Sequence, residues 1–125
     1  MIFDTDVLIW AQRGNAKAVK AIIRELDRAA SVQTYMELLQ DARNRSEQDV
    51  VKQFIRDFGF TVLPISENIS HRASVYIEQF SLSHGVRCGD ALIAATAAEN
   101  DQTLLSGNKR HFSCIPDLKF KTFRP

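Results

Sequence analysis

Short apolar segments alternate with longer amphipathic segments along the chain, and this alternation limits the possible fold more than any other feature. The short segments are predicted strands at residues 2–3, 30–33, 61–63 and 103–105. The longer ones, with apolar residues at helical spacing, are predicted helices at residues 7–13, 16–28, 34–42, 46–58, 66–85 and 89–98. This order is typical of a parallel sheet covered on both faces. We therefore predict an α/β fold, a three-layer α/β/α sandwich with a short, mainly parallel central sheet, in one domain of residues 1–125.

The last segment of the chain is the clearest basic region. Residues 118–123 alternate apolar and basic side chains, which predicts an edge strand with one wet face. Five Lys and Arg residues against the single acid Asp117 lie within residues 109–125. The whole chain has a formal net charge of only +1, so charge alone does not indicate a nucleic-acid-binding protein. A solvated surface and a phosphate contact explain this basic region equally well.

Composition indicates a protein of the cytoplasm. No apolar run approaches the ~18 residues of a membrane span. The first ten residues are apolar but include Asp4 and Asp6 and lack basic residues, which argues against a signal peptide. Cys88 and Cys114 lack the spacing of a zinc motif, so we expect free thiols in a reducing compartment.

Four polar residues fall where a parallel sheet would gather them. Asp4 directly follows the first predicted strand, and Asn108 follows the fourth. Glu37 lies one turn into a helix that follows a strand, and Asp90 begins the apolar helix at residues 89–98. Ligands bind beyond the carboxyl ends of the strands in such sheets. A buried carboxylate such as Asp4 is costly unless a cation or a helix N-terminus compensates it.

Each member of this set also has a purely structural explanation. Asp90 is a suitable N-cap for the helix it begins, and Asp6 for the helix at residues 7–13. Glu37 and Thr34 have the spacing of a capping box. Asn108 suits a turn. For Asp6 we favour the capping role.

Taken together, the residues indicate metal chemistry. Oxygen ligands without a His or Cys pair suit Mg²⁺ or Mn²⁺ rather than Zn²⁺. Three carboxylates, Asp4, Glu37 and Asp90, would repel each other at neutral pH unless a cation kept them ionised. Such a site can activate water and stabilise the charge that develops on a phosphodiester. The hypothesis is a metal-dependent nuclease.

Four segments in this order resemble a PIN-domain ribonuclease of the VapC type, the toxin of bacterial toxin–antitoxin pairs. They are MIFDTDVLI at residues 1–9, TYMELL at 34–39, GDALIAATA at 89–97 and LLSGNKRHF at 104–112. The resemblance implies an α/β/α sandwich and Mg²⁺- or Mn²⁺-dependent cleavage of structured RNA, tRNA or rRNA. It also implies an antitoxin partner, bound in an apolar groove, and a homodimer. Trp10 and Phe3 are either core residues or part of such a groove.

The resemblance carries over Asp4, Glu37 and Asp90 as metal-binding catalytic acids, with Asp6 and Asn108 in support. Asp6 stands where Asn is frequent in such toxins. Asn108 stands at the fourth acidic position of the wider family, so it can ligate or hold water but supplies no charge. Ser106 replaces a frequent Thr and keeps the supporting hydroxyl.

Basic residues and histidines around these segments have less defined roles. Arg87, Lys109 and Arg110 flank the expected site and are candidates for RNA phosphate contacts, with a surface role equally possible. The three histidines are scattered, and we assign none of them to catalysis. We expect surface or packing roles for His71, His84 and His111.

Two other functions remain open from the sequence. Asp4-Thr5-Asp6-Val7 also matches the opening of haloacid-dehalogenase-type phosphatases, with Asp4 as nucleophile and Asp6 as general acid/base. Against this, Ala94 stands where that family places a second acid. The non-enzymatic alternative is an antitoxin-binding module whose acids only cap helices, and this alternative predicts no metal binding.

Overall fold

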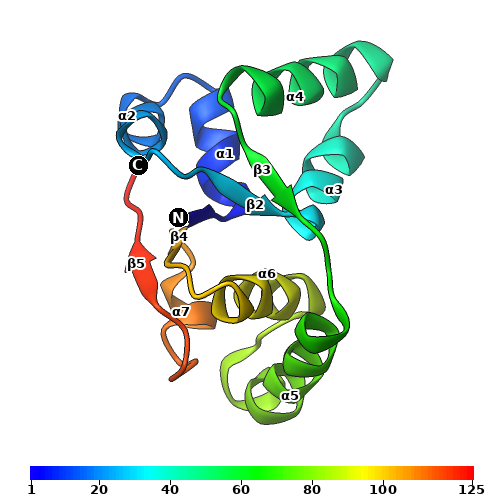
Figure 1. Cartoon of the computed structure of the whole chain (residues 1–125), viewed down its shortest axis with the longest axis vertical. Coiled ribbons are helices and arrows are strands. Elements are labelled where there is room, and N and C mark those ends of the chain that lie inside the picture. Colours follow the sequence, from blue (N-terminus) through cyan, green and yellow to red (C-terminus); the bar gives the residue numbers. More distant parts are fainter.

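A five-stranded sheet with all strands parallel forms the centre of the molecule, in the order β3-β2-β1-β4-β5 (Figure 1). This computed structural model describes residues 1–125. The strands are β1 (Ile2–Phe3), β2 (Ala29–Ser31), β3 (Thr61–Leu63), β4 (Leu104–Ser106) and β5 (Phe120–Thr122). The predicted α/β class is confirmed, and the predicted edge strand at residues 118–123 is β5.

Seven helices cover the two faces of this sheet. They are α1 (Thr5–Gln12), α2 (Ala16–Arg24), α3 (Val32–Asp41), α4 (Arg45–Asp57), α5 (Glu67–His84), α6 (Cys88–Glu99) and α7 (Lys109–Phe112). Residues of α1 to α4 share one buried apolar cluster, and residues of α5 to α7 share the other. Figure 1 shows the two groups above and below the sheet. The predicted three-layer sandwich is thus confirmed. None of the helices is long and apolar enough to cross a bilayer.

Successive residues of the inner strands belong to opposite cores. Ile2 and Leu104 pack in the cluster on the α5–α7 side, whereas Phe3 and Leu105 pack in the cluster on the α1–α4 side. This alternation follows from the pleat, which turns successive side chains to opposite faces. Strands that are buried on both faces therefore contain no polar residue until they end, and the ends are where the acids stand.

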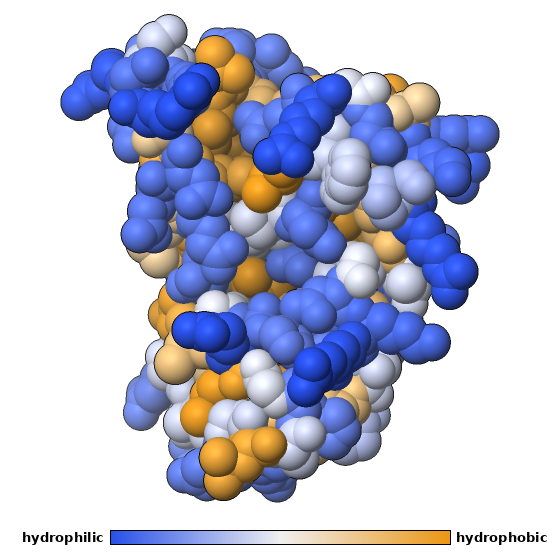
Figure 2. Space-filling view, turned by 180° about the vertical axis from the view of Figure 1, so that it is seen from behind, coloured by the Kyte–Doolittle hydropathy of each residue, from blue (hydrophilic) through white to orange (hydrophobic).

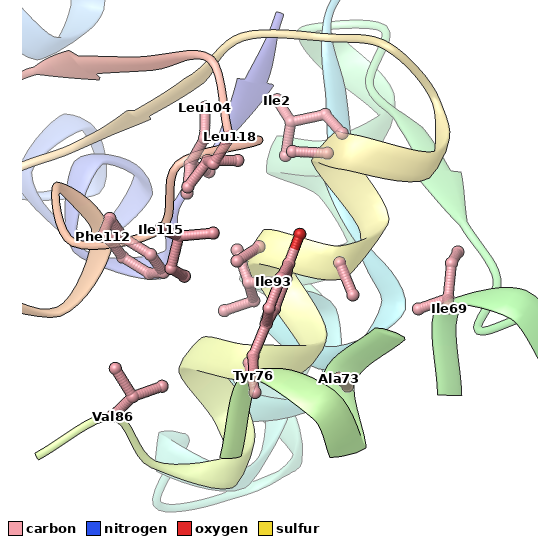
Figure 3. Packing of buried hydrophobic residues seen from close by; sticks show 14 of the residues in the cluster. Ile2, Ile69, Ala73, Tyr76, Val86, Ile93, Leu104, Phe112, Ile115 and Leu118 are labelled. Atoms are coloured by element: carbon pink, nitrogen blue, oxygen red, sulfur yellow. The ribbon is translucent and has the colours of Figure 1, made fainter. Parts of the chain in front are cut away.

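Helix α6 lies deep in the molecule because almost all of its sides are small and apolar. Ala91 and residues 93–97 of this helix are buried. Figure 3 shows Ile93 directed into the same apolar space as Leu104 and Ile115. The hydroxyl of Thr96 is the polar exception, and it donates to the carbonyl of Leu92 at 2.7 Å. Packing of α6 against the sheet fixes its N-terminus, and with it Asp90, near the strand ends.

Several helices begin or end at other residues than the sequence predicted, and local capping explains the changed starts. Helix α1 begins at Thr5, not at residue 7, because the Asp4 side chain accepts the backbone N–H of Thr5. Helix α3 begins at Val32 because Ser31 is its N-cap, so the predicted capping box of Thr34 and Glu37 is wrong. Helix α2 ends at Arg24 rather than near residue 28.

The single-turn helix α7 was not predicted. It follows the turn after β4 and has only four residues, Lys109–Phe112. Four residues are too few to show a helical period in sequence. This short helix matters for the site because it carries His111 towards Asp90.

Candidate functional site

Asp4 is buried at the carboxyl end of β1, with 6% of its surface exposed. It is the N-cap of α1, and its Oδ1 accepts the backbone N–H of Thr5 at 2.8 Å. Its Oδ2 accepts the hydroxyl of Ser106, at the end of β4, at 2.6 Å. Two neighbouring strands therefore meet at this carboxyl group, as the parallel pairing of β1 and β4 requires.

The surroundings of Asp4 raise its pKa to about 7. Burial is the largest cause, and the nearby charge of Asp6 is the next. The hydrogen bonds from Ser106 and Thr5 act in the opposite direction, and the charge of Asp90 adds a further increase. At neutral pH this carboxyl group is thus only partly ionised, and a cation beside it would favour the ionised form.

Asp6 lies beside Asp4 in the first turn of α1. Its Oδ2 accepts the backbone N–H of Gly107 at 2.9 Å. Its Oδ1 is buried and has no hydrogen-bond partner. Burial is the main reason that the pKa of Asp6 is raised. The N-cap role that the sequence favoured for Asp6 belongs instead to Asp4, which leaves Asp6 free to face the site.

Asp90 is held by contacts from two directions at the start of α6. Its Oδ2 lies 2.7 Å from Nδ1 of His111 and accepts the backbone N–H of Arg87 at 3.3 Å. Arg87, not Asp90, is the N-cap residue of this helix. The Asn108 amide nitrogen lies 2.9 Å from the same His111 nitrogen. One ring nitrogen cannot donate and accept at once, so Asp90 and Asn108 compete for it.

Glu37 reaches the same region from α3. Its Oε1 accepts the amide of Gln33 at 2.9 Å. The same oxygen lies 2.9 Å from the position that a Cβ would occupy on Gly89, the residue before Asp90. Glu37 is therefore next to the N-terminus of α6, and the absence of a side chain at position 89 makes room for it.

The turn after β4 connects the two aspartates. The Ser106 hydroxyl, which donates to Asp4, also accepts the backbone N–H of Asn108 at 2.9 Å. Gly107 has no room for a side chain, because a Cβ would lie 2.8 Å from Oδ2 of Asp6. The sequence-predicted Arg87, Lys109 and Arg110 are all exposed around this turn and the start of α6.

Sequence reasoning missed His111, for which it expected only a surface or packing role. The residue lies three positions after Asn108, which brings both side chains to one side of the single turn of α7. That spacing was the only signal in the sequence, and it becomes informative only when α7 is known to be helical. The other two histidines, His71 and His84, have no contact with the aspartates and glutamates of the site.

The oxygen-rich donor set suits a hard divalent cation. No group of three or more His, Cys, Asp and Glu side chains is arranged so that it could hold a metal ion. Mg²⁺ does not require such a group, since it keeps several waters and binds through one or two carboxylates. Such an ion would give the unpartnered Oδ1 of Asp6 a partner and would lower the raised pKa of Asp4. The donors present therefore fit Mg²⁺ or Mn²⁺.

Comparisons with known proteins agree with this architecture. The family model described as PIN domain matches residues 1–117. The chain is 32% identical over 123 residues to ribonuclease VapC10 of Mycobacterium tuberculosis, covering 95% of this chain and 90% of that protein. A toxin–antitoxin complex from Klebsiella pneumoniae contains a chain with a TM-score of 0.78 and 25% identity, covering 94% of this chain and 93% of that one. VapBC2 from Rickettsia felis shares the fold, with a TM-score of 0.79 and 16% identity over 99% of this chain and 100% of the other.

Proposed function

The chain belongs to the PIN-domain family, and from this premise we propose that it is a metal-dependent endoribonuclease, the toxin of a toxin–antitoxin pair. The observation that carries the proposal is the buried Asp4 at the end of β1, whose pKa is raised to about 7 beside Asp6 and Asp90. A binding module has no need to bring acids together in this way. Ribonuclease VapC10, to which the chain is 32% identical, supports the choice of RNA as substrate.

Asp4 and Asp90, with Glu37 as a third ligand, are the residues that would hold Mg²⁺ or Mn²⁺. The ion would keep these carboxylates ionised, make water a better nucleophile and offset the charge that develops on the phosphodiester. Asp6 would contribute through its unpartnered Oδ1. Asn108, whose amide is neutral, would position water or the substrate without adding charge.

The protein's own groups hold these ligands in place. The Ser106 hydroxyl and the Thr5 N–H orient the two oxygens of Asp4. His111 does the same for Asp90 by donating Nδ1–H to a carboxylate that can only accept. Hydrolysis forms a bond between phosphorus and the oxygen of water, breaks the bond to the leaving oxygen and transfers one proton to it. Preorganised ligands lower the barrier because they need not rearrange during this displacement.

The phosphatase alternative has lost its support. Position 94, where a second acid would be required, is an alanine with no exposed surface inside α6. Asp6, its expected general acid/base, is half-buried and accepts a backbone N–H from Gly107. The family match over residues 1–117 is to the PIN domain, and together with the similarity to ribonuclease VapC10 it supports the nuclease.

The test is cleavage of structured RNA, a tRNA or an rRNA fragment, by purified protein free of antitoxin. We expect cutting with Mg²⁺ or Mn²⁺ and none in EDTA. Asp4→Asn and Asp90→Asn should each lower the rate by several orders of magnitude, since the ion carries much of the barrier reduction. Asp49→Asn, a change of the same kind at an exposed position of α4, is the matched control. Cleavage that persists in both site variants would overturn the proposal.

Calorimetry with Mn²⁺ separates the enzyme from the inactive binding module. The wild type should bind Mn²⁺, and Asp90→Asn should bind it much more weakly. The binding-module alternative expects a flat titration for both proteins. Because this experiment needs no RNA, it remains informative even where the RNA chosen is not the natural substrate.

An apolar groove supports the antitoxin as partner. The groove, of about 490 Å³, lies between α1, α3 and α4 and includes Ile9, Leu38 and Val50. Figure 2 shows apolar surface gathered in the upper part of that view, where these helices lie. Neither Trp10 nor Phe3 lines this groove: Trp10 lines a different cleft beside Asp6, and Phe3 is fully buried. An antitoxin helix with apolar residues at i and i+4 would fit there. Co-expression of the toxin with the candidate antitoxin tests this. The two should co-purify, and Val50→Asp in the groove should weaken the complex.

We propose a homodimer and a cytoplasmic location as the remaining parts of the function. Leu26 and Leu82, at 98% and 101% exposure, are apolar residues that a second copy would cover. Both cysteines are free thiols, which supports a reducing compartment. Light scattering of the purified toxin across a dilution series tests the dimer, and a constant monomer mass would exclude it.

A further inference from the structure

Two clefts adjoin the Asp6 side of the site and share the residues that follow β5. The first, of about 440 Å³, is lined by Asp6, Gly107, Trp10, Lys109 and Arg124 among others. The second, of about 290 Å³, lies between α2 and β5. Thr122, Phe123 and Arg124 line both, so the two clefts adjoin at the end of β5, the first next to Asp6 and the second next to α2. We call the two together the α2–β5 cleft.

The α2–β5 cleft gathers six cations that form no ion pair, against the two acids Glu25 and Asp6. Lys17, Lys20 and Arg24 come from α2, and Lys109, Lys121 and Arg124 come from the other wall. All six are exposed, and none takes part in an ion pair. Only Arg43, Arg72 and Lys119 of the sixteen Lys and Arg residues are paired with carboxylates, so the cleft is distinguished by the concentration of its cations and not by their lack of partners.

The sequence spacing of α2 produces one wall of this cleft. Lys17, Lys20 and Arg24 are spaced i, i+3 and i+7, so they share one face of the helix over about 10 Å. Ala18 and Ile22 of the same helix are buried and hold it against the core. Figure 1 shows the C-terminal end of the chain running from β5 towards α2 on the left of the view. This side is on the right in Figure 2, where the surface is mostly hydrophilic.

Trp10 adds an aromatic surface where the cleft meets the site. It lines the same cavity as Asp6, Lys109 and Arg124, and 38% of it is exposed. A flat aromatic ring beside cations is the arrangement by which proteins bind single-stranded nucleic acid, with bases stacked and phosphates neutralised. An acidic protein segment would neutralise the cations but would not supply an aromatic base to stack on the Trp10 ring.

We propose that the α2–β5 cleft binds the RNA strand on one side of the scissile phosphate, with a base on Trp10 and the backbone along α2 and β5. The inference rests on the proposed nuclease function. Asp6 lines the first cleft, so a strand that is cut at the carboxylates would continue into the cleft. It assigns Lys17, Lys20 and Arg24 to the substrate, a role that the sequence did not suggest for them. These residues are positioning residues for the strand and touch no reacting atom.

Binding is measured in the full chain carrying Asp90→Asn, so that cleavage does not interfere. The probe is a labelled single-stranded RNA with Mg²⁺, titrated at several salt concentrations. The triple variant Lys17→Gln/Lys20→Gln/Arg24→Gln should bind at least tenfold more weakly. Its salt slope should fall by about two, since each phosphate contact on a single strand contributes about 0.7. The RNA should also quench the fluorescence of Trp10, the only tryptophan of the chain.

The matched control removes the same charge from another helix. Arg45→Gln/Lys52→Gln/Arg56→Gln on α4 should leave affinity and salt slope unchanged. Equal losses in both triple variants would mean that only net charge matters, and this would overturn the proposal. So would a triple α2 variant that binds RNA normally but loses an acidic protein partner. Thermal unfolding of both variants confirms that they fold.

The outcome is separable from that of the proposed function. If the wild type cuts RNA but the α2 variant binds RNA as tightly as the Asp90→Asn protein, the nuclease proposal stands and the proposal for the cleft is wrong. Loss of RNA affinity in the α2 variant with no cleavage by the wild type would retain the cleft and remove the nuclease. Because binding and cutting are measured on different proteins, neither result hides the other.

Discussion

The two halves of the candidate site differ in burial and therefore in what each contributes. Asp4 and Ser106 form the buried half together with the half-buried Asp6; Asp4 is 6% exposed and Ser106 is fully covered. Asp90, His111 and Glu37 form the open half, where the side chains of Asp90 and His111 are 19% and 22% exposed. The buried half makes ionisation unfavourable and so creates the need for a cation. The open half has partly exposed groups that a substrate can reach.

The largest expected effect tests the buried half through pH. Asp4 has a pKa near 3.8 in the unfolded chain and about 7 when folded. Between these values the folded protein keeps a proton that the unfolded chain has lost, so the free energy of unfolding must fall as pH rises from about 4 to 7. The linkage relation sets an upper bound of about 4 kcal/mol, and the raised pKa of Asp6 acts in the same direction.

Urea unfolding in EDTA at pH 5 and pH 8 measures this difference. Asp4→Asn should flatten the dependence and stabilise the metal-free protein at pH 8, whereas Asp49→Asn should change neither. Addition of Mn²⁺ at pH 8 should return the wild type to its stability at pH 5. Equal stability of the metal-free wild type at both pH values would show that Asp4 ionises without penalty, and the contrast between the halves would disappear.

Gly107→Ala is the next test of the buried half. The new Cβ would lie 2.8 Å from Oδ2 of Asp6 and 3.3 Å from the backbone oxygen of Phe123. Asp6 has a short side chain fixed by the N–H of Gly107, and backbone cannot move aside cheaply. We expect a loss of about 1–3 kcal/mol in the free energy of unfolding, the range for overpacking. Urea unfolding at pH 5 checks it, and wild-type stability would show that the turn after β4 can shift freely.

His111→Gln tests the open half. His111 holds Asp90 from outside the ligand set, and loss of such a partner lowers metal affinity or activity by about tenfold or more. Stability should change by less than about 1 kcal/mol because the ring is partly exposed. Mn²⁺ affinity by calorimetry and the RNA cleavage rate are the two readouts. His71→Gln, at an exposed position of α5, is the control and should alter neither.

The sequence predicted the frame of the molecule and the position of Asp4, but not the role of Asp6, which was expected to cap α1. Within the alternation of short and long segments, Ile2-Phe3 fits a strand covered on both faces, and an acid directly after it stands at the sheet edge. The all-parallel order follows from the alternation of strands with helices. Asp4 therefore had a predictable position, and the structure gives it the burial that the sequence argument required.

The open half and the α2–β5 cleft depend on contacts between segments that are remote in sequence. Thr34 was assigned to a cap because its local spacing is ideal, but its buried hydroxyl instead bonds Thr5 of α1 at 3.1 Å. His111 meets Asp90 across 21 positions of sequence. The face of α2 could be read from its spacing. Its position opposite β5 depends on the strand order, which no local pattern specifies.

Gly89→Ala has the smallest expected effect and sharpens the comparison with Gly107→Ala. Its Cβ would lie 2.9 Å from Oε1 of Glu37 and 3.2 Å from the amide of Gln33, a contact as close as the one at Gly107. Both neighbours are ends of flexible side chains, and alanine favours a helix over glycine by about 1 kcal/mol. Stability should therefore change by less than about 1 kcal/mol.

The displaced Glu37 should instead lower Mn²⁺ affinity severalfold. If Glu37 is a ligand, Glu37→Gln should lower that affinity as well, and the double variant should be little worse than Glu37→Gln because both changes act on one contact. Calorimetry on the three variants measures this. A stability loss in Gly89→Ala as large as that in Gly107→Ala would mean that the open half is as rigid as the buried half. The difference between the halves would then be one of exposure alone.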